Sequence, residues 1–165
     1  MGKITAKRRH PIRRSQVADL IGTLREEIGP SAELFTAKTI EVLETGTQMH
    51  IYLVDKEPLL IEKDGIIFPS LRGALARPFP ERRITVDMGA ISFVVNGADI
   101  MRPGIRDVSP DVKAGRPVQI VDERHGKPLA LGVALYDAAD LLAQEKGKVV
   151  RTFHHVGDEI WNIEL

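Results

Sequence analysis

The sequence predicts an α+β protein of two small domains, and three observations support that prediction. Before residue 77, one helical period is followed by a series of β-rich runs. The stretch 77–83 is rich in proline and polar residues, which is typical of a domain boundary. After it, short strands separated by turn residues predict a small closed barrel. A chain of 165 residues is long enough for two such domains, which we place at residues 1–81 and 82–165.

The first domain is predicted to be a two-layer α/β sandwich. Residues 15–28 have the apolar spacing of an amphipathic helix, with Ser15 as the N-cap and Gly29-Pro30 at the end. Four β-rich runs follow, at residues 38–43, 49–54, 59–61 and 66–68. The breakers between them are Thr45-Gly46, Glu57-Pro58 and Lys63-Asp64-Gly65, and the last predicts a tight hairpin. A short helix over residues 71–76 completes the two layers.

The second domain opens with a short apolar helix in residues 86–105. Asp87 is placed to cap it, and Met88, Ile91, Val94 and Val95 fall on one face. Gly97 stands where a left-handed residue would stop the helix. A strand over 99–101 and a type II turn at Pro103-Gly104 are expected next. A second helix is expected over 138–146, capped by Asp137 and ended by Gly147.

Two Gly-Ala pairs, Gly89-Ala90 and Gly97-Ala98, bracket the first of these helices. The order of residues 86–105 resembles the opening of the PUA domain, the RNA-binding module of pseudouridine synthases and archaeosine transglycosylases. Residues 114–122, 128–134, 146–150 and 154–161 resemble the later strands of that domain, with Arg116 where the family usually has an acid. The resemblance implies a PUA pseudo-barrel of mostly β structure with two short helices.

The junction of the two domains resembles a narrower family. Phe68-Pro69-Ser70-Leu71-Arg72, then Pro78-Phe79, then Val86–Ala90 are similar to the junction in the malignant T-cell-amplified-sequence family and its archaeal relatives. Those proteins place a small α/β (pre-PUA) domain before a PUA domain. The resemblance implies RNA binding linked to translation, with tRNA or rRNA as the RNA. It also implies the small ribosomal subunit or translation factors as partners.

The same resemblance implies the contact residues, because RNA bound to PUA domains runs along the first helix and the neighbouring strand. The positions carried over are Met88, Gly89, Ala90, Gly97, Ala98, Asp99, Met101, Arg102 and Pro103, with Arg151 and His154 on the closing strand. Contact would rest on backbone N–H groups near the Gly-Ala pairs and on arginines, Arg106 included. The glycines also have a packing explanation.

The formal charge is balanced, with 23 basic and 23 acidic residues, which argues against a uniformly basic surface. The balance hides a basic start, because six cations precede the first acid, Asp19: Lys3, Lys7, Arg8, Arg9, Arg13 and Arg14. Such a run is either a solvated terminus or a phosphate-binding arm. As an auxiliary arm, its members would be Lys7, Arg8, Arg9, Arg13 and Arg14.

No pattern in the chain predicts catalysis, a metal or a cofactor. The absence of cysteine excludes disulfides, thiolate catalysis and cysteine–zinc sites. The histidines lie in separate segments, and His154 and His155 would point to opposite faces of a strand. Neither a nucleophile elbow nor a glycine-rich phosphate loop occurs. No apolar run is long enough to span a membrane or to serve as a signal core, so we expect a cytoplasmic protein without membrane partners.

The preferred prediction is therefore a non-enzymatic RNA-binding protein of translation, contacting tRNA or small-subunit ribosomal RNA through its PUA domain. An alternative is an accessory subunit of an RNA-modifying enzyme of the transglycosylase or pseudouridine synthase type, because those enzymes carry the same domain. The residues before the boundary are too few for either catalytic domain. A third alternative is a protein–protein module that has lost RNA binding, which the missing acid at Arg116 leaves open but does not favour, because a cation there should attract phosphate.

Overall fold

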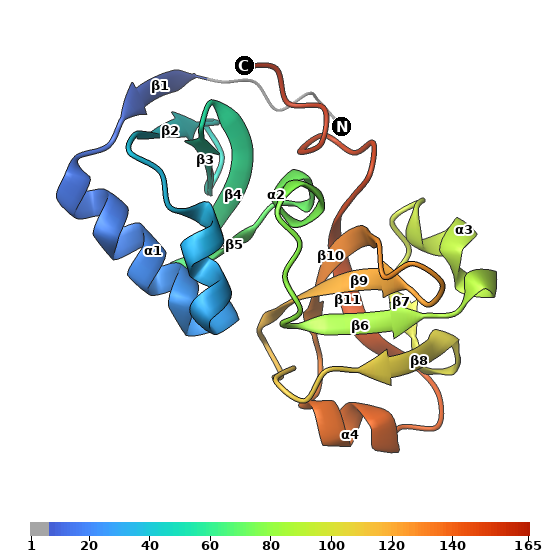
Figure 1. Ribbon diagram of the computed structural model, residues 1–165. Helices are drawn as coiled ribbons and strands as arrows, with labels where there is room; N and C mark the ends of the chain where they lie inside the picture. The colour runs from blue at the N-terminus through green and yellow to red at the C-terminus, as the bar shows by residue number, and fades with distance from the viewer. Residues whose placement is uncertain (1–6) are drawn as a thin grey trace. The chain divides into compact units, whose positions relative to one another are not determined.

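The computed structural model describes residues 7–165, which form two compact units (Figure 1). The first consists of the chain up to Phe79 together with Asn162–Leu165, and the second is Pro80–Trp161. The division falls inside the proline-rich stretch 77–83. Among the described residues, no helix is both long and apolar enough to cross a membrane.

The first unit is an antiparallel sheet with helices packed against it. Its strands follow the order β1-β2-β3-β4-β5, and α1 packs against β5. The strands are β1 (Arg8–Pro11), β2 (Ile40–Glu44), β3 (Met49–Val54), β4 (Glu57–Lys63) and β5 (Ile66–Pro69). The helices are α1 (Arg14–Ile28), the 3-10 helix η1 (Gly29–Phe35) and α2 (Leu71–Ala76). At the centre of its core, the Phe79 ring packs edge-on against Phe35 and Phe68, with centroids 6.4 and 5.8 Å apart.

The turns of this sheet show where local sequence decides structure. Asp64 and Gly65 both have left-handed φ angles, 54° and 76°, and join β4 to β5 as the predicted two-residue hairpin. The breaker expected at Glu57-Pro58 is wrong, because these residues begin β4. The turn lies one step earlier, at Asp55 and Lys56, with φ angles of 51° and 69°.

Of the two predicted helix starts in this unit, one is confirmed and the other is wrong. Helix α2 has the predicted bounds, and the Ser70 hydroxyl caps it by accepting from the Gly73 N–H at 3.1 Å. Ser15 does not cap α1. The helix begins at Arg14, and the Gln16 side chain accepts from the Arg13 N–H at 2.9 Å. A hydrogen bond from the Arg13 N–H to the Gln16 side chain therefore replaces the expected serine cap.

The second unit is a six-stranded sheet curled into a nearly closed barrel, in the order β7-β11-β10-β9-β6-β8. Only β6 and β9 pair in parallel. The strands are β6 (Arg83–Val86), β7 (Ile100–Met101), β8 (Ile105–Val108), β9 (Pro117–Asp122), β10 (Pro128–Ala134) and β11 (Lys148–His155). Its core is built from aliphatic side chains such as Val86, Ile120 and Val150.

Short helices join these strands: η2 (Met88–Ala90), α3 (Ile91–Val94), η3 (Arg102–Gly104) and α4 (Ala138–Ala143). This arrangement confirms the predicted α+β class, with a mostly β barrel and two short α-helices. Two details are wrong. Helix α4 ends at Ala143, and the Asp137 carboxylate accepts from the Ala114 N–H instead of capping it. Gly104 lacks the left-handed φ of a type II turn and lies in η3.

Candidate functional site

An apolar hollow of about 540 Å³ lies between η2, α3, β7 and η3 in the second unit. We call it the η2–β7 hollow. Its apolar walls include Ala90, Phe93, Val94, Ile100 and Met101. Phe93 is 66% exposed and Met101 is 50% exposed. Side chains of this size are normally covered, and exposed apolar groups that gather around a hollow indicate a binding site.

The hollow gathers most of the residues that the sequence predicts as RNA contacts. Those that line it are Gly89, Ala90, Ala98, Asp99, Met101 and Pro103. Met88 lies next to them in η2 and is 38% exposed. Gly97 stands at the end of the helix with a φ of 85°, and a Cβ there would come within 2.8 Å of the His155 ring. Gly89 has no such packing role, since a Cβ there would meet only the Asp87 carboxylate, at 3.3 Å.

Local sequence explains how the hollow is formed. The Asp87 carboxylate accepts from the Ala90 N–H at 2.9 Å, which confirms the predicted cap of the short helix. The Asp87 N–H donates to the Gly104 carbonyl at 2.9 Å and ties η2 to η3. A Cβ on Gly104 would lie 3.4 Å from the Ala90 methyl, so the two segments approach closely. One acid therefore both starts the helix and sets the spacing of the hollow.

Two carboxylates, Asp87 and Asp99, are the acidic groups of the hollow. Asp99 lies 2.9 Å from the Lys148 ammonium and also accepts from the Thr152 N–H. The hydrogen bond from Lys148 holds the pKa of Asp99 below its ordinary value, although burial opposes that shift. Asp87 lies 4.0 Å from the Arg106 guanidinium. Because these acids repel anions, the hollow suits an uncharged planar or apolar group better than a phosphate.

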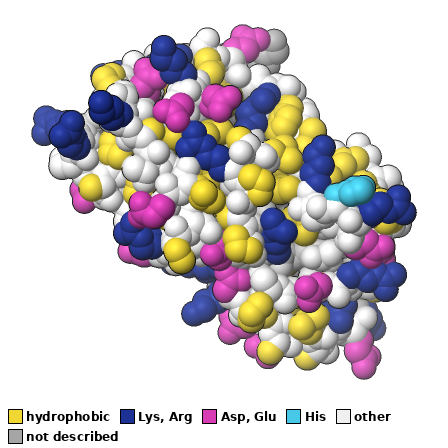
Figure 2. All heavy atoms as spheres, viewed as in Figure 1, with side chains coloured by type: hydrophobic (Ala, Val, Ile, Leu, Met, Phe, Trp, Pro, Cys, Tyr) yellow, Lys and Arg dark blue, Asp and Glu magenta, His cyan; other side chains and the backbone are white. Residues whose placement is uncertain are grey.

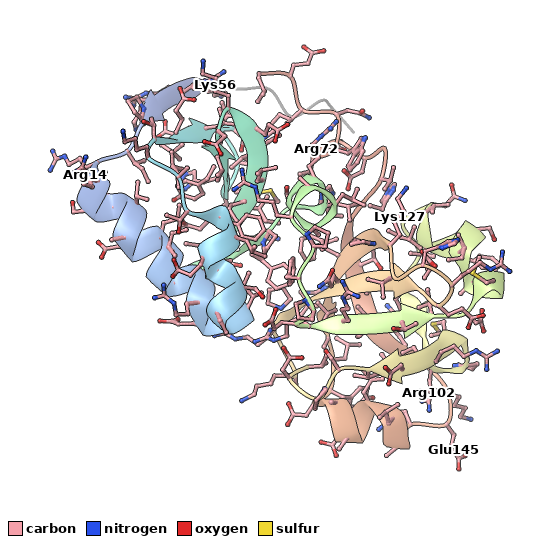
Figure 3. The ribbon with its side chains drawn as sticks, in the orientation of Figure 1. Arg14, Lys56, Arg72, Arg102, Lys127 and Glu145 are labelled. Carbon is pink, nitrogen blue, oxygen red and sulfur yellow. The ribbon has the colours of Figure 1, made fainter. Side chains whose placement is uncertain are left out.

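Arg102 is turned away from the hollow. Its guanidinium donates to the Leu142 carbonyl at 3.2 Å and to the Ile105 carbonyl at 3.5 Å, and Figure 3 shows it near the α4 end of the unit. Its side chain therefore links η3 to α4. Arg102 remains a predicted RNA contact, but its guanidinium already has partners within the protein.

His154 is also removed from the candidate surface, because only 1% of it is exposed. Its Nδ1 lies 2.8 Å from the Asp158 carboxylate, which also accepts from the backbone N–H groups of His155 and Trp161. Burial is the largest single influence and raises the pKa of Asp158, but the bond and charge of His154 together with the two backbone N–H donors hold that pKa below its ordinary value. Arg151, by contrast, is exposed on β11, next to the Thr152 that binds Asp99.

The basic start of the chain is partly neutralised. β1 pairs with β2, so Arg8 lies 3.7 Å from Glu44 and Arg9 lies 3.0 Å from Glu41. Arg13 and Arg14 are exposed at the start of α1, and Arg14 extends from the helix in Figure 3. Lys3 lies outside the described residues. Figure 2 shows cationic and acidic side chains interspersed over the face it presents, in keeping with the balanced charge.

Sequence reasoning missed Phe93 and the loop between β9 and β10. Phe93 falls off the apolar face formed by Val94 and its neighbours. A large aromatic residue on the outer side of a short helix was the signal that could have identified it. The loop carries Arg124, His125 and Lys127 on a rigid turn, which only the structure reveals.

Comparison with known proteins decides the family. Residues 82–156 match the PUA domain. Over 115 residues the chain is 43% identical to an uncharacterized protein of Methanocaldococcus jannaschii, covering 69% of this chain and 70% of that one. It is 33% identical over 142 residues to translation machinery-associated protein 20 of Saccharomyces cerevisiae, covering 81% of this chain and 77% of that protein. It is 30% identical over 131 residues to malignant T-cell-amplified sequence 1-B of Xenopus laevis, covering 76% of this chain and 71% of that protein.

The chain belongs to the malignant T-cell-amplified-sequence family of PUA-domain proteins. Solved structures share the fold of this chain. A hypothetical protein of Pyrococcus horikoshii is similar over 93% of this chain and 98% of its own, with a TM-score of 0.84 and 34% identity. A PUA-domain protein of Aeropyrum pernix shares the fold, with a TM-score of 0.77 at 24% identity over 97% of this chain and 96% of its own. The η2–β7 hollow thus belongs to the PUA domain of a member of this family.

Proposed function

We propose that this protein is a cytoplasmic RNA-binding protein of translation that contacts tRNA or small-subunit ribosomal RNA through its PUA domain. It acts by binding and not by catalysis. The PUA match and the relatives named as translation machinery-associated proteins support this proposal. The proposed partners follow the same reasoning: an RNA and, through it, the small ribosomal subunit or a translation factor.

The observation that carries the proposal is the η2–β7 hollow with its exposed Phe93 and Met101. Sequence-specific recognition of RNA relies on unpaired bases that stack on aromatic or apolar side chains. A base is uncharged and planar, whereas a phosphate would meet Asp87 and Asp99. The carboxylates can also accept hydrogen bonds from the exocyclic amino groups of bases. We therefore place an unpaired base from an RNA end or loop in the hollow.

The test is the pair Phe93→Ala and Met101→Ala in the full chain. Both side chains are exposed, so folding should be preserved, and a melting curve checks this. Stacking of a base on an aromatic side chain contributes about 1–3 kcal/mol, so we expect affinity for a tRNA pool to fall by about tenfold or more. Filter binding on the tRNA pool and on purified small ribosomal subunits measures the change.

Leu135→Ala is the matched control, because Leu135 is a 40% exposed apolar residue of the same unit outside the hollow. The proposal fails if the unaltered protein binds neither target at low salt. It also fails if the Phe93 and Met101 variants bind like the control.

We further propose that the two predicted domains divide the work, with the first docking on a larger assembly. Tethering a second site raises apparent affinity through effective concentration. Residues 82–165 expressed alone should then bind free tRNA like the full chain, yet bind small ribosomal subunits less tightly. Equal binding of the fragment and the full chain to both targets would remove the docking role.

A further inference from the structure

An RNA whose base occupies the η2–β7 hollow needs cations for its phosphates, and the hollow supplies acids instead. Its titratable groups are Asp87 and Asp99. Lys148 is held by Asp99, and Arg106 lies between Asp87 and Glu123, at 4.0 and 3.2 Å. These cations are therefore offset by protein carboxylates. Phosphates adjoining the bound base must find other cations nearby.

The β9–β10 loop (residues 123–127) is a hydrogen-bonded turn next to this hollow. Asp122, the last residue of β9, is buried and its carboxylate accepts from the N–H groups of Arg124, His125 and Lys127 at 2.5 to 3.1 Å. Burial alone raises the pKa of Asp122, but the three N–H groups outweigh it and hold that pKa below its ordinary value. Hydrogen bonds to an ionised carboxylate are stronger than neutral ones, so Asp122 stabilises the conformation of the loop.

Direct contacts connect this loop with the rim of the hollow. The Glu123 N–H donates to the Val86 carbonyl at 3.0 Å, one residue before Asp87. The Arg106 guanidinium joins the Glu123 carboxylate to that of Asp87. A Cβ on Gly126 would lie 3.3 Å from the Arg83 guanidinium, which adds a further cation beside the loop. The loop and the hollow are therefore parts of one continuous surface.

The loop presents cations that no acid offsets. Arg124, His125 and Lys127 are all exposed, and among residues 7–165 no acidic side chain forms an ion pair with Arg124 or Lys127. Asp122 turns its carboxylate inward to the backbone, so it holds the loop without neutralising these side chains at the surface. A fixed loop loses less entropy on binding than a mobile arm does.

We propose that Arg124 and Lys127 on the β9–β10 loop bind the phosphodiester backbone of the RNA whose base occupies the η2–β7 hollow. This inference rests on the proposed function. It makes the loop a second contact of the PUA domain, separate from the first helix and its neighbouring strand. Arg106, between its two acids, positions the loop against the hollow.

The test compares Arg124→Gln/Lys127→Gln in the full chain with unaltered protein, using a tRNA pool at several salt concentrations. Each lost phosphate contact reduces the slope of log affinity against log salt by about 0.7–0.9. We expect the slope to become shallower by about 1.4–1.8 and affinity at low salt to fall by about tenfold. The charge-reversed pair Arg124→Glu/Lys127→Glu should lower affinity further.

Lys113→Gln/Lys146→Gln is the matched control, since both lysines are exposed in the same unit and the charge change is equal. They flank α4, and Figure 3 shows Glu145, the neighbour of Lys146, at the opposite end of the unit from Lys127. An unchanged salt slope in Arg124→Gln/Lys127→Gln, or the same change in the control, overturns the inference. If the Phe93 variant loses binding while this pair does not, the proposed function stands and the loop contact is wrong. If unaltered protein binds no RNA, the proposed function and the loop contact are both wrong.

Discussion

Strand β1 and the β9–β10 loop are both basic, yet the structure makes them different surfaces. In β1, Arg8 and Arg9 face Glu44 and Glu41 on the neighbouring strand, and the bond to Arg9 holds the pKa of Glu41 below its ordinary value. In the loop, no acidic side chain among the described residues forms an ion pair with Arg124 or Lys127, while Asp122 bonds to the backbone. A run of cations along a chain is therefore not yet a positive surface. Whether a basic segment forms a positive surface depends on whether the neighbouring strand places acidic side chains beside its cations.

The same distinction separates two arginines of the second unit. Arg102 is committed to the carbonyl groups of Leu142 and Ile105, whereas Arg151 is exposed on β11. A cation bound to protein carbonyl groups contributes to stability, and a cation exposed on the surface can also contact a ligand. The predictions below test that division, from the largest expected effect to the smallest.

Asp122→Ala should have the largest effect. It removes the acceptor of three backbone N–H groups, and hydrogen bonds to charged groups contribute about 1.5–3 kcal/mol each without being additive. We expect the free energy of unfolding to fall by about 3 kcal/mol and RNA affinity to fall with it. Urea unfolding measures the first quantity. Asp107→Ala, an exposed acid on β8, is the control, and equal stability of the two variants would contradict the role of Asp122.

The effect of Asp122 should depend on pH. Because its folded pKa lies below the ordinary value of 3.8, the carboxylate stabilises the fold fully above that pH. That contribution is lost as the pH falls through the lower folded pKa. The stability gap between unaltered protein and Asp122→Ala should therefore be constant near neutrality and shrink below pH 3.8. A gap that widens on acidification would show that the carboxylate is not what holds the loop.

Arg102→Ala should lower the free energy of unfolding by about 1–2 kcal/mol, because two carbonyls lose their donor. Arg151→Ala should change it by no more than about 0.5 kcal/mol, yet reduce the salt slope of RNA binding by about 0.7–0.9. Denaturant curves and salt titrations on both variants decide this. If Arg151→Ala destabilises as much as Arg102→Ala does, the division between committed and available cations is wrong.

Glu41→Gln/Glu44→Gln should have the smallest effect. It frees Arg8 and Arg9, so RNA affinity at low salt should rise by about two- to threefold and the gain should disappear at high salt. Glu26→Gln/Glu57→Gln removes the same charge from exposed acids of the same unit and serves as the control. An equal rise in both variants would mean that net charge alone is responsible.

Elements defined by neighbouring residues were predictable from the sequence. The Asp64-Gly65 hairpin, helix α2, the Asp87 cap and the left-handed Gly97 all follow from chemistry within a few positions. The turn at Asp55-Lys56 was missed because a lysine rarely adopts a left-handed φ. The start of α1 was misplaced because the side chain of Gln16, and not Ser15, satisfies the first N–H.

The site was predictable only in part, because its partners come from distant segments. The sequence places Gly89, Ala98 and Met101 near one another, and the hollow gathers them. It does not reveal that Arg102 meets Leu142, 40 residues later, or that Arg9 meets Glu41. Long-range pairing decides which charges remain available, and no local pattern encodes it.

The pairing of β7 determines when the hollow can exist. β7 forms one wall of the hollow and, within residues 7–165, pairs with β11 alone, while Asp99 is held by Lys148 and Thr152 of that same last strand. A chain still being synthesised therefore carries Phe93 and Met101 for some fifty residues of elongation before their binding wall can form. On the proposed function, RNA binding through the hollow requires a chain that has completed β11, and a copy that ends before β11 lacks this wall.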